Sequence, residues 1–325
     1  MGVIVTGAAG FIGSCIVRAL NDKGNDDIVI VDNISSTEKW KNLVNKKYRE
    51  YVHKSEFLER LDEYKNVDAV IHMGACSSTT ETDFDYLWKN NFEYTRTLWI
   101  YCVENNLPFI YASSAATYGD GSHGFSDIAD IKQLRPLNGY GYSKHLFDLW
   151  AEKQEKYPPQ HVGLKFFNVY GPNEYYKGSM ASMVYHGFKQ IKETGRIKLF
   201  KSYEDDIEDG MQLRDFVYVK DVCDIVLWLL ETKNVNGLFN VGTGEARSFK
   251  ELAEAIFEAL KMTPVIEYID MPKELVGKYQ SYTRADICKL HEAGYCNNFY
   301  KVKGGNKEGV RDYVVNYLEQ EFEVY

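Results

Sequence analysis

Near its N-terminus the chain reads Gly2-Val3-Ile4-Val5-Thr6, followed directly by Gly7-Ala8-Ala9-Gly10-Phe11-Ile12-Gly13. The first five residues predict a β-strand, and the glycines of the G-x-x-G-x-x-G pattern behind it let the backbone approach a pyrophosphate. The next segment, residues 11–20, predicts a helix whose N-terminal amides face such an anion. A glycine-rich turn without a ligand is the alternative, because short glycine patterns also arise by chance.

The second predicted strand favours a dinucleotide site. Residues Ile28-Val29-Ile30-Val31 end in Asp32, roughly twenty residues further along, where a carboxylate can hydrogen-bond an adenosine ribose. A helix between two such strands makes a right-handed βαβ unit. We therefore predict an α/β fold whose first half is a Rossmann-like, doubly wound parallel sheet.

Composition and charge limit the possible partners and the compartment. The chain has 325 residues, enough for two domains, and its net charge of −9 argues against a nucleic-acid partner. No apolar run approaches the ~18 residues of a membrane span, and the chain begins directly with a strand. We expect a cytoplasmic protein without an export signal. The six cysteines are scattered and lack the closely spaced pairs that bind metals, which favours reduced thiols over disulfides or zinc. They are Cys15, Cys76, Cys102, Cys223, Cys288 and Cys296.

Strands alternate with helices through the first half of the chain. Further parallel strands are predicted at 67–71, 108–112 and 162–167. A helix is predicted over residues 91–104, between the first two of them. Behind them the pattern loosens, because residues 168–172 break the sheet.

The second half predicts a smaller domain that is discontinuous in sequence. The acidic stretch 203–210 predicts a solvated loop, whereas a helix at 221–231 and a strand at 237–241 are regular enough to rejoin the sheet. We therefore assign the chain to two domains. The dinucleotide-binding domain is 1–168, joined by 215–241, and the α/β substrate domain is 169–214 with 242–325.

A tyrosine and a lysine four residues apart indicate acid–base chemistry. On a helix, the spacing of Tyr140 and Lys144 puts phenol and ammonium on one face, whereas Tyr142 faces elsewhere. A neighbouring cation favours the phenolate and so lowers the pKa of the phenol toward that of a working base. A solvated helix face is the alternative in a chain with 25 tyrosines. Ser114 favours catalysis, because it ends a predicted strand where its hydroxyl can bond both phenol and substrate.

Several sequence blocks together resemble the extended short-chain dehydrogenase/reductases that act on nucleotide sugars. They are the glycine pattern, Tyr140-x-x-x-Lys144, residues 113–119 and residues 167–172. Further blocks closely resemble the family of ADP-L-glycero-D-manno-heptose 6-epimerases, and they lie at residues 74–81, 177–182 and 214–219. The similarity spans nearly the whole chain. One departure is the stretch from Tyr203 to Leu213, which looks longer than the family's connection and bears on how the nucleotide end of a substrate is held.

The resemblance implies a redox epimerase, an isomerase that inverts C6 of the heptose in ADP-D-glycero-D-manno-heptose for lipopolysaccharide core synthesis. Hydride leaves C6 to bound NADP, a base takes the hydroxyl proton, and the aldehyde turns to accept hydride on its other face. Two faces require acid–base groups at two places, and Lys177 is the second candidate beside Tyr140. An ordinary surface lysine is the alternative for Lys177. The family also implies a homo-oligomer, specifically a homopentamer.

NADP is the implied cofactor, and NAD remains an alternative. The carboxylate of Asp32 favours the free diol of NAD, whereas Lys39 and Lys54 can offset its repulsion of a 2′-phosphate. Matching the family's motifs residue by residue gives the expected cofactor-binding residues Gly7, Gly10, Phe11, Ile12, Gly13, Asp32, Asn33, Lys39, Lys54, Met73, Gly74, Ala75, Cys76, Ser77, Asn91, Lys144, Val169 and Lys177.

The same match gives the expected substrate-binding residues Asn168, Ser179, His186, Phe200, Lys201, Ser202, Tyr203, Arg214 and Tyr279. Arg214 has an independent reason, because a planar guanidinium holds diphosphate oxygens bidentately; a salt bridge with the acidic loop is its alternative. His186 lies on an apolar-periodic segment, so a core histidine is nearly as good an interpretation. The histidines form no i,i+4 pair, and we predict no metal.

Three other functions remain open. A nucleotide-sugar 4,6-dehydratase shares the fold but carries an Asp-Glu acid pair where this chain has Ala115-Ala116. A non-catalytic NADP-binding protein would need neither Tyr140 nor Lys144. An NDP-hexose 4-epimerase differs from the heptose 6-epimerase interpretation only at the Lys177 block and at the substrate-binding residues that match the heptose 6-epimerase family. The sequence does not fix the nucleotide of the substrate.

Overall fold

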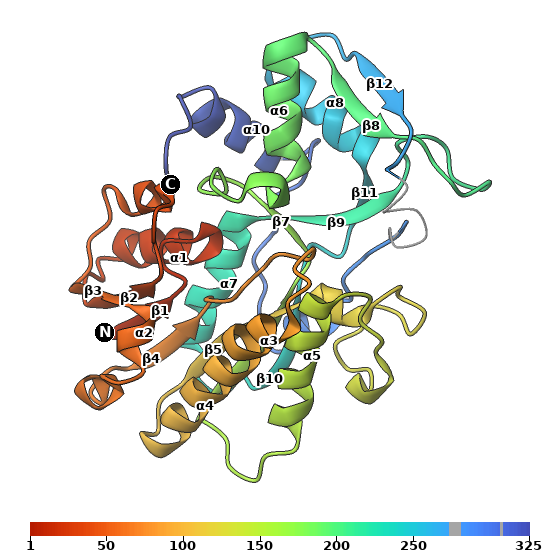
Figure 1. Ribbon diagram of the computed structural model, residues 1–325. Coiled ribbons are helices and arrows are strands. Elements are labelled where there is room, and N and C mark those ends of the chain that lie inside the picture. The colour runs from red at the N-terminus through yellow and green to blue at the C-terminus, as the bar shows by residue number, and fades with distance from the viewer. Residues whose placement is uncertain (273–280, 306–307) are drawn as a thin grey trace.

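The centre of the computed structural model, which describes residues 1–272, 281–305 and 308–325, is a seven-stranded parallel sheet (Figure 1). Its order is β10-β6-β5-β4-β1-β2-β3. The strands are β1 (Val3–Thr6), β2 (Ile28–Asp32), β3 (Glu50–His53), β4 (Ala69–His72), β5 (Phe109–Ser114), β6 (His161–Phe166) and β10 (Gly237–Val241). The order reverses direction between β1 and β4, which confirms the predicted doubly wound, Rossmann-like sheet.

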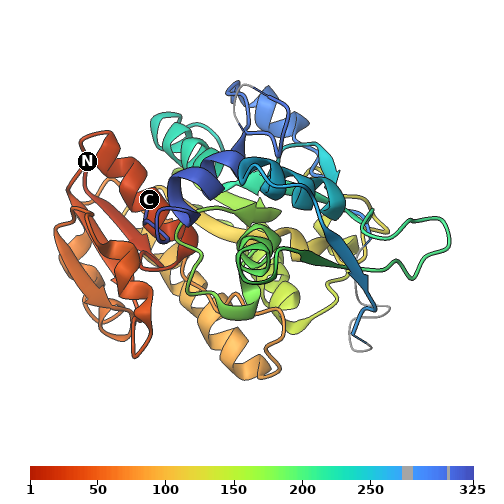
Figure 2. The same ribbon diagram turned by 90° about the horizontal axis from the view of Figure 1, so that it is seen from above.

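Helices cover both faces of this sheet, because its strands are apolar on both sides (Figure 2). Val3 and Val5 belong to one core with α1 (Phe11–Asp22) and α7 (Val219–Glu231). Ile4 points the other way, into a core with two further helices, α4 (Tyr94–Glu104) and α5 (Gly139–Glu152). Alternate residues of one short strand therefore fix helices on opposite faces.

The chain leaves the main sheet after β6 and builds two small sheets. In the first, β7 (Asn168–Tyr170) pairs with β9 (Leu213–Tyr218), which pairs antiparallel with β11 (Ala246–Ser248). The second joins β8 (Ile197–Phe200) to β12 (Ile266–Ile269).

Two helices of this second part, α6 (Met183–Thr194) and α8 (Phe249–Ala259), pack together in the upper part of Figure 1. The remaining short helices are α2 (Lys54–Phe57), α3 (Phe84–Leu87), α9 (Cys288–Glu292) and α10 (Gly309–Tyr313). Residues 215–241 were expected to rejoin the main sheet. Within this range β10 does so by pairing with β6, whereas β9 lies in a small sheet. The division into two domains stays a prediction. None of the helices in the described ranges is long and apolar enough to cross a membrane.

A fully buried ion pair joins β6 to α5. Lys165 Nζ lies 3.1 Å from Asp148 Oδ2, and neither side chain has exposed surface. The ammonium also donates to Thr117 Oγ1 at 2.6 Å. The carboxylate accepts from Ser113 Oγ at 2.6 Å and from the Tyr111 hydroxyl at 3.1 Å. These additional hydrogen bonds offset part of the cost of removing both charges from water.

Lys165→Met is expected to lower the free energy of unfolding by about 3–5 kcal/mol, because the Asp148 carboxylate then stays buried without its cation. Urea unfolding measures this change. The control is Lys65→Met, which breaks an exposed ion pair of 2.7 Å with Asp62 and should cost less than about 1 kcal/mol. Equal losses in the two variants would contradict the stabilising role of the buried pair.

Candidate functional site

The glycine turn between β1 and α1 closes onto the end of β4. Gly7 has φ +67°, and a Cβ at this position would lie 2.7 Å from the backbone nitrogen of Gly74. A Cβ on Gly13 would collide with the carbonyl oxygen of Gly7. Helix α1 begins directly behind the turn, and no described side chain caps its N-terminus. The turn therefore has bare backbone at its glycines beside the positive end of α1, an arrangement that suits an anion.

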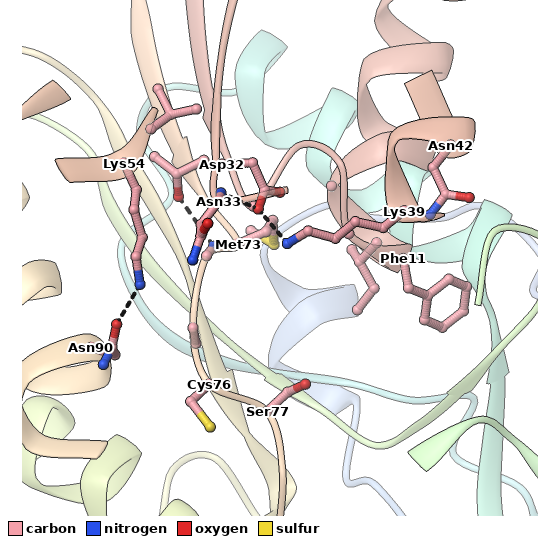
Figure 3. Close-up of a pocket in the computed structure, with 18 of the residues that line it drawn as sticks. Phe11, Asp32, Asn33, Lys39, Asn42, Lys54, Met73, Cys76, Ser77 and Asn90 are labelled. Atoms are coloured by element: carbon pink, nitrogen blue, oxygen red, sulfur yellow. Dashed lines mark hydrogen bonds and ion pairs between the residues drawn. The ribbon is translucent and has the colours of Figure 1, made fainter. Parts of the chain in front are cut away.

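A cavity of about 340 Å³ lies over this turn and is shown in Figure 3; we call it the first cavity. Its wall contains every expected cofactor-binding residue except Asn91, Lys144 and Val169. The glycine cradle and this wall fit a dinucleotide. Eight further residues line this cavity and were not predicted from the sequence: Thr6, Val31, Asn42, Tyr86, Asn90, Tyr94, Asn173 and Tyr176.

The carboxylate of Asp32 is already surrounded by donors. Its Oδ2 accepts from the Ala9 amide at 2.8 Å, and its Oδ1 accepts from Lys39 Nζ at 2.7 Å. Figure 3 shows Lys39 directed at this carboxylate and Lys54 directed at Asn90, to which its ammonium donates at 2.7 Å. Burial and the nearby charge of Lys39 lower the pKa of Lys54. Two ammonium groups therefore stand at the Asp32 end of the first cavity, and only one of them is paired with the carboxylate.

A second cavity, of about 310 Å³, adjoins the first. Ser114 at the end of β5 and Tyr140 on α5 line it, and so do the neighbouring residues Phe166, Phe167, Asn168, Val169 and Tyr170 at the end of β6 and in β7. Further lining residues come from the segment before α6 and from α6, β9 and α8, namely Met180, Ala181, Ser182, Met183, Val184, Phe216, Phe249 and Leu252. Four residues line both cavities: Phe11, Ile12, Ser77 and Lys177. The two cavities therefore meet beside Lys177.

Tyr140 stands in the first turn of α5, where the Asn138 side chain caps the helix by accepting from the Gly141 amide at 2.8 Å. Burial raises the pKa of the Tyr140 phenol, and a side-chain hydrogen bond with Ser114 opposes this rise. Ser114 Oγ also accepts from the Ala116 amide at 3.1 Å. The Tyr140 phenol and the Ser114 hydroxyl at the end of β5 therefore line the same cavity, close enough for Ser114 to affect the pKa of the phenol.

Lys144 points from α5 toward β5. Its Nζ donates to the Ala112 carbonyl oxygen at 2.9 Å, and burial lowers its pKa to about 8. The shift of the Tyr140 pKa comes from burial, Ser114 and Cys76, so the expected lowering by Lys144 is not found. Burial of the phenol is the largest contribution to its pKa, and the Lys144 ammonium is bonded to the Ala112 carbonyl oxygen of β5.

Lys177 lies half-buried between the cavities, with Nζ 5.2 Å from the centre of the Phe11 ring. Burial lowers the pKa of this ammonium, and the charge of Glu174 opposes the shift. A lowered pKa makes the neutral amine more accessible near neutral pH, as a proton acceptor requires.

Asn91 lies behind the wall of the first cavity, with no exposed surface. Its Oδ1 accepts from the Cys76 amide at 2.8 Å. Its Nδ2 donates to the Cys76 carbonyl oxygen at 3.0 Å and to Ser143 Oγ at 2.9 Å. The side chain therefore fastens the loop of Cys76 to α5 rather than lining the nicotinamide side as expected.

Of the expected substrate residues that the structure describes, Asn168 lines the second cavity. Arg214 is buried in β9 with its guanidinium 5.7 Å from the centre of the Phe249 ring, and Phe249 does line the cavity. Ser179 is exposed, and His186 is half-buried against the Tyr185 ring.

Of the other expected residues, Phe200 ends β8, and Lys201, Ser202 and Tyr203 follow it; all four are outside the lining of the second cavity. Lys201 forms a 3.0 Å ion pair with Asp270. Tyr279 lies outside the described residues. Three lining residues that were not predicted come from β9 and α8. Phe216 belongs to the 214–219 block, whereas no sequence motif marks Phe249 and Leu252. Met180 and Ser182 belong to the 177–182 block, whose resemblance to the family could have identified them as lining residues.

Comparison with known proteins gives the family. The sequence model of the NAD dependent epimerase/dehydratase family matches residues 3–242. An ADP-L-glycero-D-manno-heptose-6-epimerase of Nitratidesulfovibrio vulgaris is 54% identical over 96% of this chain and 97% of the relative. One from Fusobacterium nucleatum is 50% identical over 98% of each chain.

Solved structures agree with this assignment. The ADP-L-glycero-D-manno-heptose-6-epimerase of Helicobacter pylori has a TM-score of 0.80 and 28% identity, covering 97% of this chain and 95% of its own. A UDP-glucose 4-epimerase of Thermus thermophilus, solved with NAD, has a TM-score of 0.75 and 25% identity, covering 97% and 98%. The chain therefore belongs to the NAD dependent epimerase/dehydratase family and, within it, to the family of ADP-L-glycero-D-manno-heptose-6-epimerases.

Proposed function

We propose that the two cavities form one active site for epimerisation at C6 of the heptose in an ADP-heptose. The reaction converts ADP-D-glycero-D-manno-heptose to ADP-L-glycero-D-manno-heptose, a precursor for the lipopolysaccharide core. The relatives at 54% and 50% identity carry this activity in their names. The observation that carries the proposal is that Lys177 lines both cavities while Tyr140 and Ser114 line the second.

The chemistry requires a bound dinucleotide, because the hydrogen on an unactivated carbinol carbon is not acidic enough for direct removal. When bound in the first cavity, its nicotinamide supplies a hydride acceptor and donor. The protein must move the hydroxyl proton of C6 and admit both orientations of the resulting aldehyde. We assign the proton at one face to Tyr140, assisted by Ser114, and the proton at the other face to Lys177.

We propose NADP as the dinucleotide. In an NAD site the carboxylate after the second strand is available to the ribose diol. Here the Asp32 carboxylate accepts from Lys39 Nζ, and Lys54 adds a second cation at the same end. A 2′-phosphate would relieve the repulsion between the two ammonium groups. This charge arrangement supports NADP over NAD.

For the substrate we propose that Arg214 binds the diphosphate and Asn168 the sugar. Ser179, His186, residues 200–203 and Tyr279 are proposed as further contacts on the strength of the family's motif. A homo-oligomer and a cytoplasmic location stay predictions. An NDP-hexose 4-epimerase is the second candidate, and product analysis by NMR with ADP-heptose and UDP-hexose offered side by side separates the two.

Tyr140→Phe and Lys177→Met are each expected to lower the turnover of epimerisation by about 10²–10⁴-fold, the usual contribution of an acid–base group. The substitutions leave the dinucleotide cavity formed, so the bound cofactor should be retained. NMR of the product measures turnover, and absorbance after denaturation measures the cofactor. Tyr142→Phe, which changes an exposed phenol on the same helix, is the control. Activity of either site variant within threefold of the wild type would refute that residue's role.

Freshly purified protein is expected to release NADP on denaturation, because the cofactor need not leave between the two hydride steps. Mass spectrometry of the released dinucleotide measures this.

Lys54→Met should weaken NADP binding to the emptied protein by about 10–100-fold, the range expected for a charge-assisted hydrogen bond, and should leave NAD binding unchanged. Calorimetry measures both affinities. Lys89→Met is the control, since Lys89 is exposed and outside the cavity wall. Release of NAD alone would overturn the choice of NADP while leaving the epimerase chemistry intact.

A further inference from the structure

The segment from Gly171 to Ser182 connects β7 to α6 and carries Lys177 near its middle. Within it, Glu174 has no exposed surface. A carboxylate at such a position is costly unless hydrogen bonds satisfy it. Glu174 does not line either cavity, so contact with a ligand does not explain its burial.

The Glu174 carboxylate ties the two ends of this segment together. Oε1 accepts from the Gly171 amide at 3.3 Å and from Ser182 Oγ at 2.6 Å. Oε2 accepts from the Ser182 amide at 2.5 Å. One side chain therefore fixes both the point where the segment leaves β7 and the point where α6 begins.

The backbone between these ends is folded around Lys177. Its amide donates to the Glu174 carbonyl oxygen at 3.0 Å, and its own carbonyl accepts from the Met180 amide at 3.1 Å. Gly178 follows with φ +57°, a conformation that favours glycine. The turn directs Lys177 over the ring of Phe11, where the two cavities meet.

The electrostatics of Glu174 agree with a buried carboxylate held by donors. Burial raises its pKa, whereas the hydrogen bonds from Ser182 and Gly171 and the charge of Lys177 lower it. Three N–H and O–H donors point at its two oxygens, and a protonated acid would have to turn one oxygen into a donor. The hydrogen-bond pattern therefore favours the ionised form.

We propose that Glu174 is a positioning residue for Lys177, holding the 171–182 segment so that the lysine stays at the boundary of the two cavities. The inference rests on the proposed role of Lys177 as the second acid–base group. Glu174 itself touches neither substrate nor cofactor. Its contribution to the reaction should therefore disappear when Lys177 is removed.

A purely structural role is the alternative. Ser182 Oγ caps α6 by accepting from the Tyr185 amide at 3.3 Å, so losing Glu174 could weaken the helix alone. Such an effect would lower the melting temperature and would act on turnover in the same way whether or not Lys177 is present. A double-mutant cycle separates the two roles.

The experiment measures kcat and KM of epimerisation for Glu174→Gln, Lys177→Met and the double variant, with product formation followed by NMR at high enzyme concentration. A lysine displaced by about 1 Å predicts a loss of up to ~10²-fold in kcat for Glu174→Gln, with KM within twofold. In the Lys177→Met background the same change should cost less than twofold. Asp221→Asn is the matched control, because it turns another buried carboxylate, which accepts from the Tyr300 amide, into an amide outside both cavities.

Equal losses from Glu174→Gln in both backgrounds, or an unchanged kcat, would overturn the inference. If Lys177→Met itself keeps near-wild-type activity, the proposed function of Lys177 fails, and that result is read from the single variant alone. Should Glu174→Gln not fold, Glu174→Asp replaces it. An aspartate keeps the charge but is too short to reach both Gly171 and Ser182, so it should also lower kcat only when Lys177 is present.

Discussion

The close approach of the glycine turn to the end of β4 is the constraint on which the site depends. Gly7 and Gly74 lie so near each other that neither backbone could tolerate a side chain at Gly7. The absence of side chains leaves the carboxyl edge of the sheet open above β1, and α1 can begin immediately behind the turn. The first cavity lies over this turn, and the Ala9 amide of the turn donates to the Asp32 carboxylate.

The second cavity depends on a different kind of constraint, the return of the chain from the main sheet. Pairing of β7 with β9 accompanies the placement of α6 and α8 at the second cavity, which Ser114 of β5 and Tyr140 of α5 also line. The segment between β7 and α6 then delivers Lys177 to the junction of the cavities. The proposed acid–base groups, Tyr140 and Lys177, stand on two separate segments, which suits a reaction that must serve both faces of one carbon.

The sequence allowed the main sheet and the dinucleotide cavity to be predicted, because both rest on local patterns. Runs such as 28–31 are apolar and β-branched, and the glycines occupy fixed positions behind β1. The strand Glu50–His53 was missed since its residues are largely polar. Asn42 and Asn173 were missed because only tertiary packing brings them to the cavity.

The predicted chemistry was harder to place than the predicted fold. Helical spacing correctly put Lys144 one turn from Tyr140, yet it could not reveal that the ammonium bonds to the Ala112 carbonyl. Asn91 matched the family's motif, and its side chain is used instead to hold the loop of Cys76. The residues that α8 contributes to the second cavity, Phe249 and Leu252, were not predicted, because only tertiary packing brings this distant element to the cavity.

We infer that hydrogen leaves C6 as hydride and returns to the same carbon within the site that the two cavities form. ADP-D-glycero-D-manno-heptose carrying deuterium at C6, incubated with the enzyme in ordinary water, tests it most directly. The epimerised product should retain the deuterium at C6, as seen by mass spectrometry and proton NMR, because hydride held in the site does not exchange with solvent. Loss of the label to water during epimerisation would show that the carbon is deprotonated instead and would rule out the hydride mechanism.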